Sequence, residues 1–111
     1  MKIEIEISND VIEDILVTAF EGGINYWVDR VEFDGEGYAS DWLQKGDAHV
    51  LLLHDADGEE VHELTMPKLL EGIGMAIAEG RSVFDSDGAC VDADGADAII
   101  QLALFKEIIY G

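Results

Sequence analysis

The chain has 111 residues, with 25 acidic side chains against 6 basic ones and a formal net charge of −19. A surface this negative repels nucleic acid and anionic membranes, and it attracts basic proteins and cations. The length suits one domain over residues 1–111 with a single hydrophobic core. An apolar fraction of 49% argues against an intrinsically disordered chain.

Cysteine content and the N-terminus indicate the compartment. Cys90 is the only cysteine, which excludes a disulfide within the chain and is typical of a reducing cytoplasm. The first residues, MKIEIE, contain no apolar segment of the kind found in export signals. No apolar run approaches the ~20 residues of a membrane span. We therefore expect a cytoplasmic protein that does not bind membranes.

The N-terminal part predicts a strand followed by a helix. Residues 2–7 alternate charged side chains with isoleucine, the pattern of a half-buried strand. Apolar side chains then recur at helical spacing over residues 11–20. Acidic side chains lie opposite this apolar stripe: Asp10, Glu13, Asp14 and Glu21. Gly22 is expected to end the helix in the left-handed conformation that glycine adopts readily.

Three further strands are predicted in the middle of the chain. Residues 24–33 are rich in aromatic and β-branched side chains, which favour a strand. The unbroken apolar run within residues 48–54 predicts a strand covered on both faces. Residues 61–64 return as the second arm of a hairpin around the Asp57-Gly58 turn. Between the first two of these strands, residues 34–47 form an acidic, glycine-containing connection.

Thr65 predicts the cap of a second helix, which Gly80 ends. Its expected buried stripe consists of Met66, Leu69, Leu70, Ile73 and Ile77. Gly72 and Gly74 each lower its intrinsic stability by ~1 kcal/mol relative to alanine. We therefore expect this helix to approach a neighbouring element closely. An irregular acidic segment is predicted to follow over residues 81–91.

The closing segment, residues 92–111, opens with aspartates suited to capping a helix and is then apolar on nearly every side. Its polar side chains are few: Asp97, Gln101, Lys106 and Glu107. Such a helix belongs in the interior, so we expect it to be the core element on which the chain packs. The predicted class is α+β, with an antiparallel three-stranded sheet packed by three helices. Residues 2–7 leave a fourth strand open.

The sequence contains no pattern that predicts a catalytic, metal or cofactor site. The Asp-x-Asp-Gly segments at residues 55–58, 85–88 and 92–95 lack the ligand and glycine spacing of a calcium loop. A two-residue hairpin turn places His54 and His62 on opposite sheet faces, whereas a three-residue turn would bring them together. Aspartates around Cys90 disfavour a reactive thiolate. We therefore expect a protein that is not an enzyme and carries no metal or cofactor.

The charge has three interpretations: halophilic adaptation, a plain solvated surface, or carboxylates that stand in for the phosphates of nucleic acid. Duplex DNA carries one charge per ~1.7 Å of axis, a density that acidic loops can approach. Exposed aromatic residues in the acidic connection would anchor an interface. The predicted partner-binding residues are Asp34, Glu36, Asp41, Trp42, Asp55, Asp57, Glu59, Glu60, Asp85 and Asp87.

Two stretches carry a resemblance to a known group of proteins: residues 15–27 (ILVTAFEGGINYW) and residues 94–111 (DGADAIIQLALFKEIIYG). Together with the middle helix they resemble small acidic proteins of unknown function from bacteriophages and prophages. By analogy, the resemblance suggests an inhibitor of host restriction or CRISPR systems that imitates nucleic acid. The expected partner is a basic, nucleic-acid-binding host protein rather than nucleic acid itself. The alternative is a structural or assembly protein of the phage that acts as a homo-oligomer, such as a homodimer.

Overall fold

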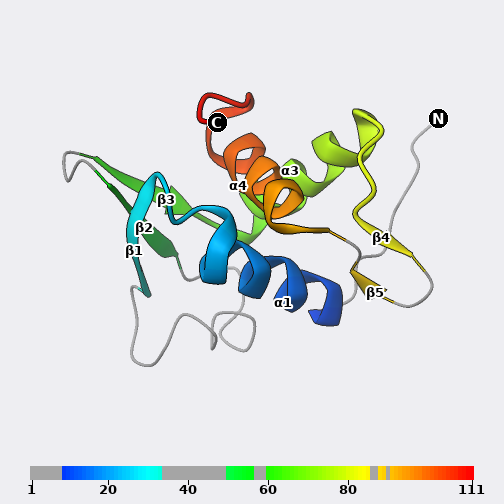
Figure 1. The fold of residues 1–111 in the computed structure, drawn as a ribbon, viewed down its shortest axis with the longest axis horizontal. Helices are drawn as coiled ribbons and strands as arrows, with labels where there is room; N and C mark the ends of the chain where they lie inside the picture. The colour runs from blue at the N-terminus through cyan, green and yellow to red at the C-terminus, as the bar shows by residue number, and fades with distance from the viewer. Residues whose placement is uncertain (1–8, 34–49, 57–59, 86–87, 90) are drawn as a thin grey trace.

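The computed structural model describes residues 9–33, 50–56, 60–85, 88–89 and 91–111 (Figure 1). The elements follow in the order α1 (Asn9–Thr18), η1 (Ala19–Gly23), β1 (Val28–Phe33), β2 (Leu51–Asp55), β3 (Val61–Leu64), α3 (Met66–Ala78), β4 (Phe84–Asp85), β5 (Gly88–Ala89) and α4 (Ala93–Phe105). The predicted strand at residues 2–7, the acidic connection 34–47 and Cys90 lie outside the described residues. None of the helices in the described part of the chain has the length and apolar character that crossing a membrane requires.

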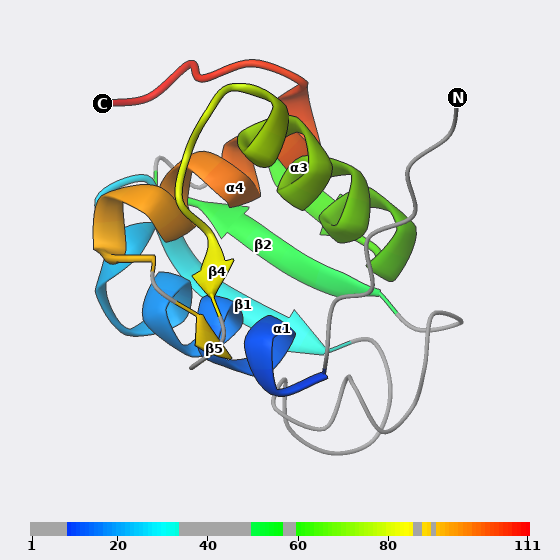
Figure 2. The same ribbon diagram turned by 90° about the vertical axis from the view of Figure 1, so that its right-hand side faces the viewer.

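The three-stranded antiparallel sheet has the order β1-β2-β3, which confirms the predicted α+β class. In the β2–β3 hairpin, His54 pairs with Val61 and Leu53 pairs with His62. This is the register that a two-residue turn requires, so the two histidines lie on opposite faces of the sheet. A second, two-stranded sheet of β4 and β5 occupies part of the segment predicted to be irregular. It lies beside α1 (Figure 2).

The helices lie together on one side of the three-stranded sheet (Figure 1). On the covered face, Leu51, Leu53 and Leu64 are fully buried. On the opposite face of β2, Leu52 and His54 are only half-buried. The prediction that this strand is covered on both faces is therefore confirmed for one face, while the other is only partly covered. Alternating strand residues point to opposite faces, and the helices cover only one of them.

The first helix does not end as the sequence predicts. After α1 the backbone widens into the π-helical turn η1, and Gly22 does not have a positive φ. The prediction of a left-handed Gly22 is therefore wrong. Gly23, not Gly22, is the glycine that is closely packed: a Cβ atom on Gly23 would lie 2.7 Å from the backbone oxygen of Ala93, whereas a Cβ atom on Gly22 would meet nothing within 4 Å. Glycine at position 23 allows η1 to approach the start of α4.

The predicted limits of α3 are confirmed at both ends. Thr65 Oγ1 accepts a hydrogen bond from the backbone N–H of Lys68, and Gly80 has a φ of 85°. The expected close approach is also confirmed, because a Cβ atom on Gly72 would lie 2.7 Å from the backbone oxygen of Ile99 in α4. Leu70, which was expected in the buried stripe, is 41% exposed. It lies on the side of the helix that faces away from α4.

The closing helix α4 is the centre of the core, as predicted. Asp92 caps it by accepting a hydrogen bond from the N–H of Gly95 at 2.8 Å. The residues buried in succession are Ala96, Asp97, Ala98, Ile99, Ile100, Gln101, Leu102 and Ala103. The helix ends at Phe105 because Lys106 adopts a left-handed conformation with φ 63°, and it does not continue to Gly111. The last residues turn back over the structure as a C-terminal tail.

Candidate functional site

The exposed side of α1 and η1 carries a row of carboxylates, defined here as the α1 acidic face. It consists of Asp10, Glu13, Asp14 and Glu21, all of which are exposed. The row arises because the apolar residues of the same helix are buried at helical spacing on the other side. From Asp10 to Glu21 the helix rises ~16 Å, so neighbouring carboxylates are on average ~5–6 Å apart along the axis, against ~3.4 Å per phosphate along one strand of DNA.

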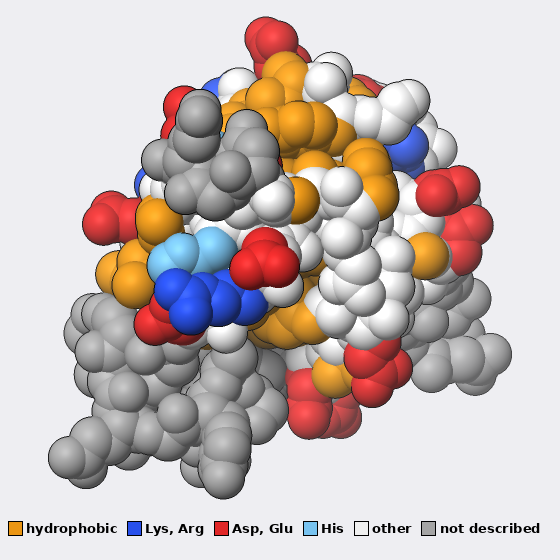
Figure 3. Space-filling view, turned by 60° about the vertical axis from the view of Figure 1, so that its left-hand side comes forward, with side chains coloured by type: hydrophobic (Ala, Val, Ile, Leu, Met, Phe, Trp, Pro, Cys, Tyr) orange, Lys and Arg blue, Asp and Glu red, His pale blue; other side chains and the backbone are white. Residues whose placement is uncertain are grey.

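The basic residues that the structure describes are already engaged elsewhere. Arg30 pairs with Glu32 at 3.0 Å, and Lys106 pairs with Glu71 at 2.9 Å. Arg81 lies 3.5 Å from a Glu79 oxygen, while the Lys68 ammonium donates to the backbone oxygen of Glu63. No described lysine or arginine pairs with the α1 acidic face. Figure 3 shows the same imbalance on one side of the molecule, where acidic side chains are spread around the rim and basic ones are few.

The structure places only part of the predicted partner-binding set. Glu60 is exposed, and Asp85 lies in β4, where its side chain is not described. Asp34, Glu36, Asp41, Trp42, Asp57, Glu59 and Asp87 lie outside the described residues. Asp55 is only 6% exposed, so the prediction that it belongs to an open acidic surface is wrong. It is buried because it sits at the end of β2 on the covered face, beneath the C-terminal tail.

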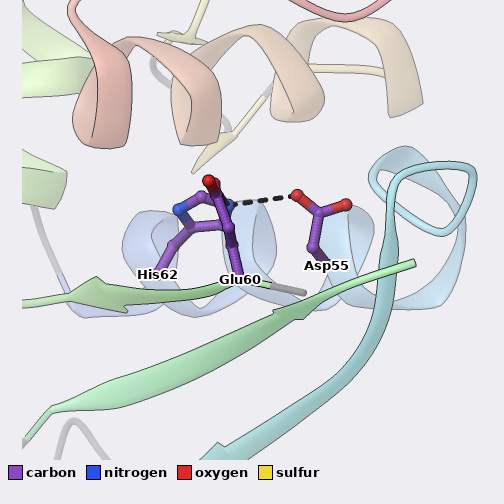
Figure 4. Close-up of side chains that lie close together, drawn as sticks. All are labelled: Asp55, Glu60 and His62. Carbon is purple, nitrogen blue, oxygen red and sulfur yellow. Dashed lines mark hydrogen bonds and ion pairs between the residues drawn. The ribbon is translucent and has the colours of Figure 1, made fainter. Parts of the chain in front are cut away.

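The side chains at the end of the β2–β3 hairpin form a second acidic group, defined here as the hairpin cluster. It consists of Asp55, Glu60 and His62, which Figure 4 shows together. His62 Nε2 lies 3.4 Å from Asp55 Oδ2 and 3.9 Å from Glu60 Oε2. From the C-terminal tail, the hydroxyl of Tyr110 donates to Asp55 Oδ2 at 3.2 Å.

Aromatic rings surround the buried side of the hairpin cluster. The Tyr110 ring stacks on Trp27, with centroids 4.8 Å apart and planes 10° apart. Phe105 meets the His62 ring edge-on at 5.0 Å. Trp27 is 2% exposed and also contacts both Phe105 and His62. These contacts fix the tail over the hairpin and hold the His62 ring in one orientation.

A buried carboxylate in α4 anchors the other side of the same aromatic group. Asp97 Oδ1 accepts hydrogen bonds from Trp27 Nε1 at 2.8 Å and from Gln101 Nε2 at 2.9 Å. Its Oδ2 accepts from the Tyr26 hydroxyl at 2.5 Å. Three donors satisfy both oxygens, which is what a buried carboxylate requires. With its oxygens engaged in this way, Asp97 serves to position Trp27 and Tyr26.

Gln101 links this carboxylate to the C-terminal tail. Its side-chain oxygen accepts from the backbone N–H groups of Ile109 and Tyr110, both at 2.8 Å. Its amide nitrogen donates to Asp97 and to the backbone oxygen of Tyr110. Gln101 is fully buried, and its hydrogen bond to Asp97 is buried with it, whereas its bonds to the tail are partly buried. They bring Tyr110 to the hairpin, although it lies far from Asp55 in the sequence.

The same network changes the acidity of one tyrosine. Desolvation of the hydroxyl and its hydrogen bond to the Asp97 carboxylate raise the pKa of Tyr26 to about 12. The protonated phenol is favoured because its ionised form would face a carboxylate at hydrogen-bond distance. Tyr26 therefore remains a donor across the physiological range.

The α1 acidic face was not predicted as an interface, because the predicted partner-binding residues were chosen largely from connections and turns. The signal was present, since four acidic residues lie opposite the apolar stripe of the predicted helix. We also predicted no joint role for Asp55 and His62, although the hairpin register places them on one face. The interactions of Asp97 with Tyr26 and Trp27 had no signal in the local sequence.

Comparisons of the chain with protein-family models, with curated proteins and with solved structures found no match. They therefore lend no support to the resemblance to phage and prophage proteins. The charge of the chain and the geometry of the described residues are the features that bear on its function.

Proposed function

We propose that this protein is a non-enzymatic binding protein whose acidic surface engages the basic, nucleic-acid-binding face of a host protein. In this proposal it is a phage-type inhibitor that acts in the host cytoplasm and imitates nucleic acid. The observation that carries the proposal is the α1 acidic face, where four exposed carboxylates lack a described basic partner. The net charge of −19 extends the same field over the whole chain.

Electrostatics supports a protein partner with a complementary charge. A row of like charges on a rigid helix holds its spacing without the entropy cost of ordering loops. Its carboxylates are ~5–6 Å apart, wider than the ~3.4 Å between phosphates of one DNA strand, so a groove built for phosphates would meet charges of the same sign at a lower density. Association steered by such a surface is fast and sensitive to salt.

A competition experiment tests the proposal. Bacterial proteins retained on duplex-DNA resin serve as the probe, and this protein competes with labelled duplex DNA for them over a range of salt concentrations. The test variant neutralises three carboxylates of the α1 acidic face: Glu13→Gln, Asp14→Asn and Glu21→Gln. The matched control neutralises three exposed carboxylates on other elements: Asp29→Asn, Glu63→Gln and Glu107→Gln.

We expect the unaltered protein to compete at low salt and to lose competition as salt rises. The α1 variant should require roughly tenfold more protein, at ~0.5 kcal/mol or more per interfacial charge, and should show a flatter salt dependence. The control should stay close to the parent. The absence of competition at any salt would contradict the proposal, and equal losses in the two variants would remove α1 from the interface.

One observation favours the alternative, a phage assembly protein that forms a homo-oligomer. Several large apolar side chains are exposed: Val17, Tyr26, Val61, Leu70, Ile108 and Ile109. Tyr26 and Ile108 line a common hollow at the C-terminal tail. Sedimentation separates the two candidates. A mass of 12.1 kDa favours the binding protein, whereas a dimer that Ile108→Asp dissociates favours assembly.

A further inference from the structure

The β2–β3 hairpin brings three metal-ligating side chains to one face of the sheet. The backbone N–H of Asp55 donates to the backbone carbonyl oxygen of Glu60 at 2.9 Å, which sets these two residues opposite each other. His62 follows Glu60 by two residues and therefore points to the same face. Its strand partner is the buried Leu53, which confirms the direction. The register of the hairpin alone thus produces the cluster.

The distances in the hairpin cluster match the size of a small transition-metal ion. A tetrahedral zinc site with ligands at ~2.0–2.2 Å has ligand atoms ~3.3–3.6 Å apart. His62 Nε2 and Asp55 Oδ2 are already 3.4 Å apart. The Glu60 oxygen is 3.9 Å from the same nitrogen, and all three atoms lie within 4.8 Å of one another. The Glu60 side chain is 70% exposed, so its carboxylate is not held in place by packing.

The buried carboxylate of Asp55 has two polar neighbours, both at long hydrogen-bond distance. Asp55 is 6% exposed, and its contacts to His62 and Tyr110 measure 3.4 and 3.2 Å. Charge-assisted hydrogen bonds are usually ~2.5–2.9 Å long, and a buried charge without close compensation is costly. Asp55 and Glu60 place two carboxylates beside the same imidazole. A divalent cation would neutralise both.

We propose that Asp55, Glu60 and His62 bind a zinc ion. One imidazole nitrogen with two carboxylate oxygens is a ligand set that suits zinc, whereas calcium and magnesium prefer oxygen ligands alone. The Tyr110 hydroxyl holds Asp55 from outside the ligand set, and Phe105 fixes the His62 ring, as supporting residues do around metal sites. Three protein ligands leave a fourth position for water. The site is separate from the α1 acidic face and independent of the proposed function.

Titration calorimetry with zinc alone tests the site, in buffer with excess Mg²⁺ to suppress binding to the acidic surface in general. The test variants are His62→Asn and Glu60→Gln. The matched control is His54→Asn, because His54 lies in the same hairpin on the opposite face and has Glu32 2.6 Å away. Cobalt(II), whose visible absorption reports four-coordinate geometry, provides a second readout. Circular dichroism of each metal-free variant verifies the fold.

We expect one zinc ion per chain, a rise in melting temperature with zinc, and binding that weakens at acid pH because the ligands must be deprotonated. His62→Asn should weaken binding by about 100-fold and Glu60→Gln by at least about tenfold, since loss of a direct ligand should cost no less than the ~10–100-fold typical of changes to the groups around the ligands. His54→Asn should bind like the parent. Zinc binding that Mg²⁺ abolishes, or equal effects of His62→Asn and His54→Asn, would overturn the proposal. If His62→Asn fails to fold, the Glu60→Gln variant decides the question, and unchanged zinc binding by that variant would overturn the proposed site.

Discussion

Two glycines of α3 provide a controlled test of how closely this helix packs on α4. A Cβ atom on Gly72 would lie 2.7 Å from the backbone oxygen of Ile99 and 2.8 Å from both the Cβ atom and the backbone nitrogen of Ala103. A Cβ atom on Gly74 would meet nothing within 4 Å. Gly72→Ala should therefore destabilise the protein relative to Gly74→Ala, although the two changes are chemically identical.

The magnitude follows from two terms. In a helix interior, alanine is favoured over glycine by ~1 kcal/mol, and this gain is common to both variants. Gly72→Ala adds an overpacking cost of ~1–3 kcal/mol, because backbone atoms of Ile99 and Ala103 cannot move aside as a side chain can. Gly74→Ala should thus raise the free energy of unfolding by up to ~1 kcal/mol. The variants should differ by ~1–3 kcal/mol, or at least ~4 °C in melting temperature.

Urea and thermal unfolding monitored by circular dichroism measure both variants. The m-value should remain unchanged, since the surface exposed on unfolding is nearly the same. Equal stabilities would show that α3 and α4 do not approach each other as closely as the structure has them. A Gly74→Ala variant less stable than the parent would show that this side of α3 is covered.

Two further predictions concern the network around Asp97. Gln101→Met keeps the length of the side chain but removes the acceptor of two tail N–H groups and a donor to the buried Asp97 carboxylate. The free energy of unfolding should fall by ~2–4 kcal/mol. Amide hydrogen exchange at Ile109 and Tyr110 should become faster, and unchanged exchange would contradict the prediction. The folded-state pKa of Tyr26, about 12, lies above its ordinary value of 10.0. Its contribution to stability is therefore full below pH 10 and is lost as pH rises toward 12, because the unfolded chain ionises first. Unfolding of the parent and of Tyr26→Phe over this pH range measures the loss, and a constant difference between them would refute it.

Much of the fold was determined by local patterns in the sequence. Thr65 caps α3 as predicted, and one of the opening aspartates, Asp92, caps α4, since capping depends on a side chain and an N–H group three residues away. The Asp57-Gly58 signal predicted the hairpin but left two turn lengths open, and the observed register is that of the two-residue turn. The apolar character of residues 96–103 predicted a central helix, which α4 is. These features depend on neighbours in the sequence, so the sequence alone was sufficient.

The helix ends were less predictable because they depend on packing as well as on residue type. Gly22 and Gly23 are equivalent in the sequence, yet only Gly23 faces another element closely. Lys106, rather than a glycine, takes the left-handed conformation that ends α4. The end of α4 is followed by the C-terminal tail, whose Ile109 and Tyr110 contact Gln101 and whose Tyr110 ring stacks on Trp27. The point at which the helix ends is therefore linked to tertiary contacts of the tail.

The candidate sites were decided by the tertiary structure. In the sequence, Asp55 and Glu60 are both acidic residues of the same hairpin segment. In the structure, Asp55 is covered by the C-terminal tail through Tyr110, which lies 55 residues further along the chain, whereas Glu60 is exposed. In the sequence, Asp97 is a polar residue within an apolar helix, with no indication of its partners. In the structure its hydrogen-bond donors are Tyr26, 71 residues earlier, and Trp27. The physical reason is that burial and hydrogen bonding of a carboxylate depend on groups brought near it only by the packed fold.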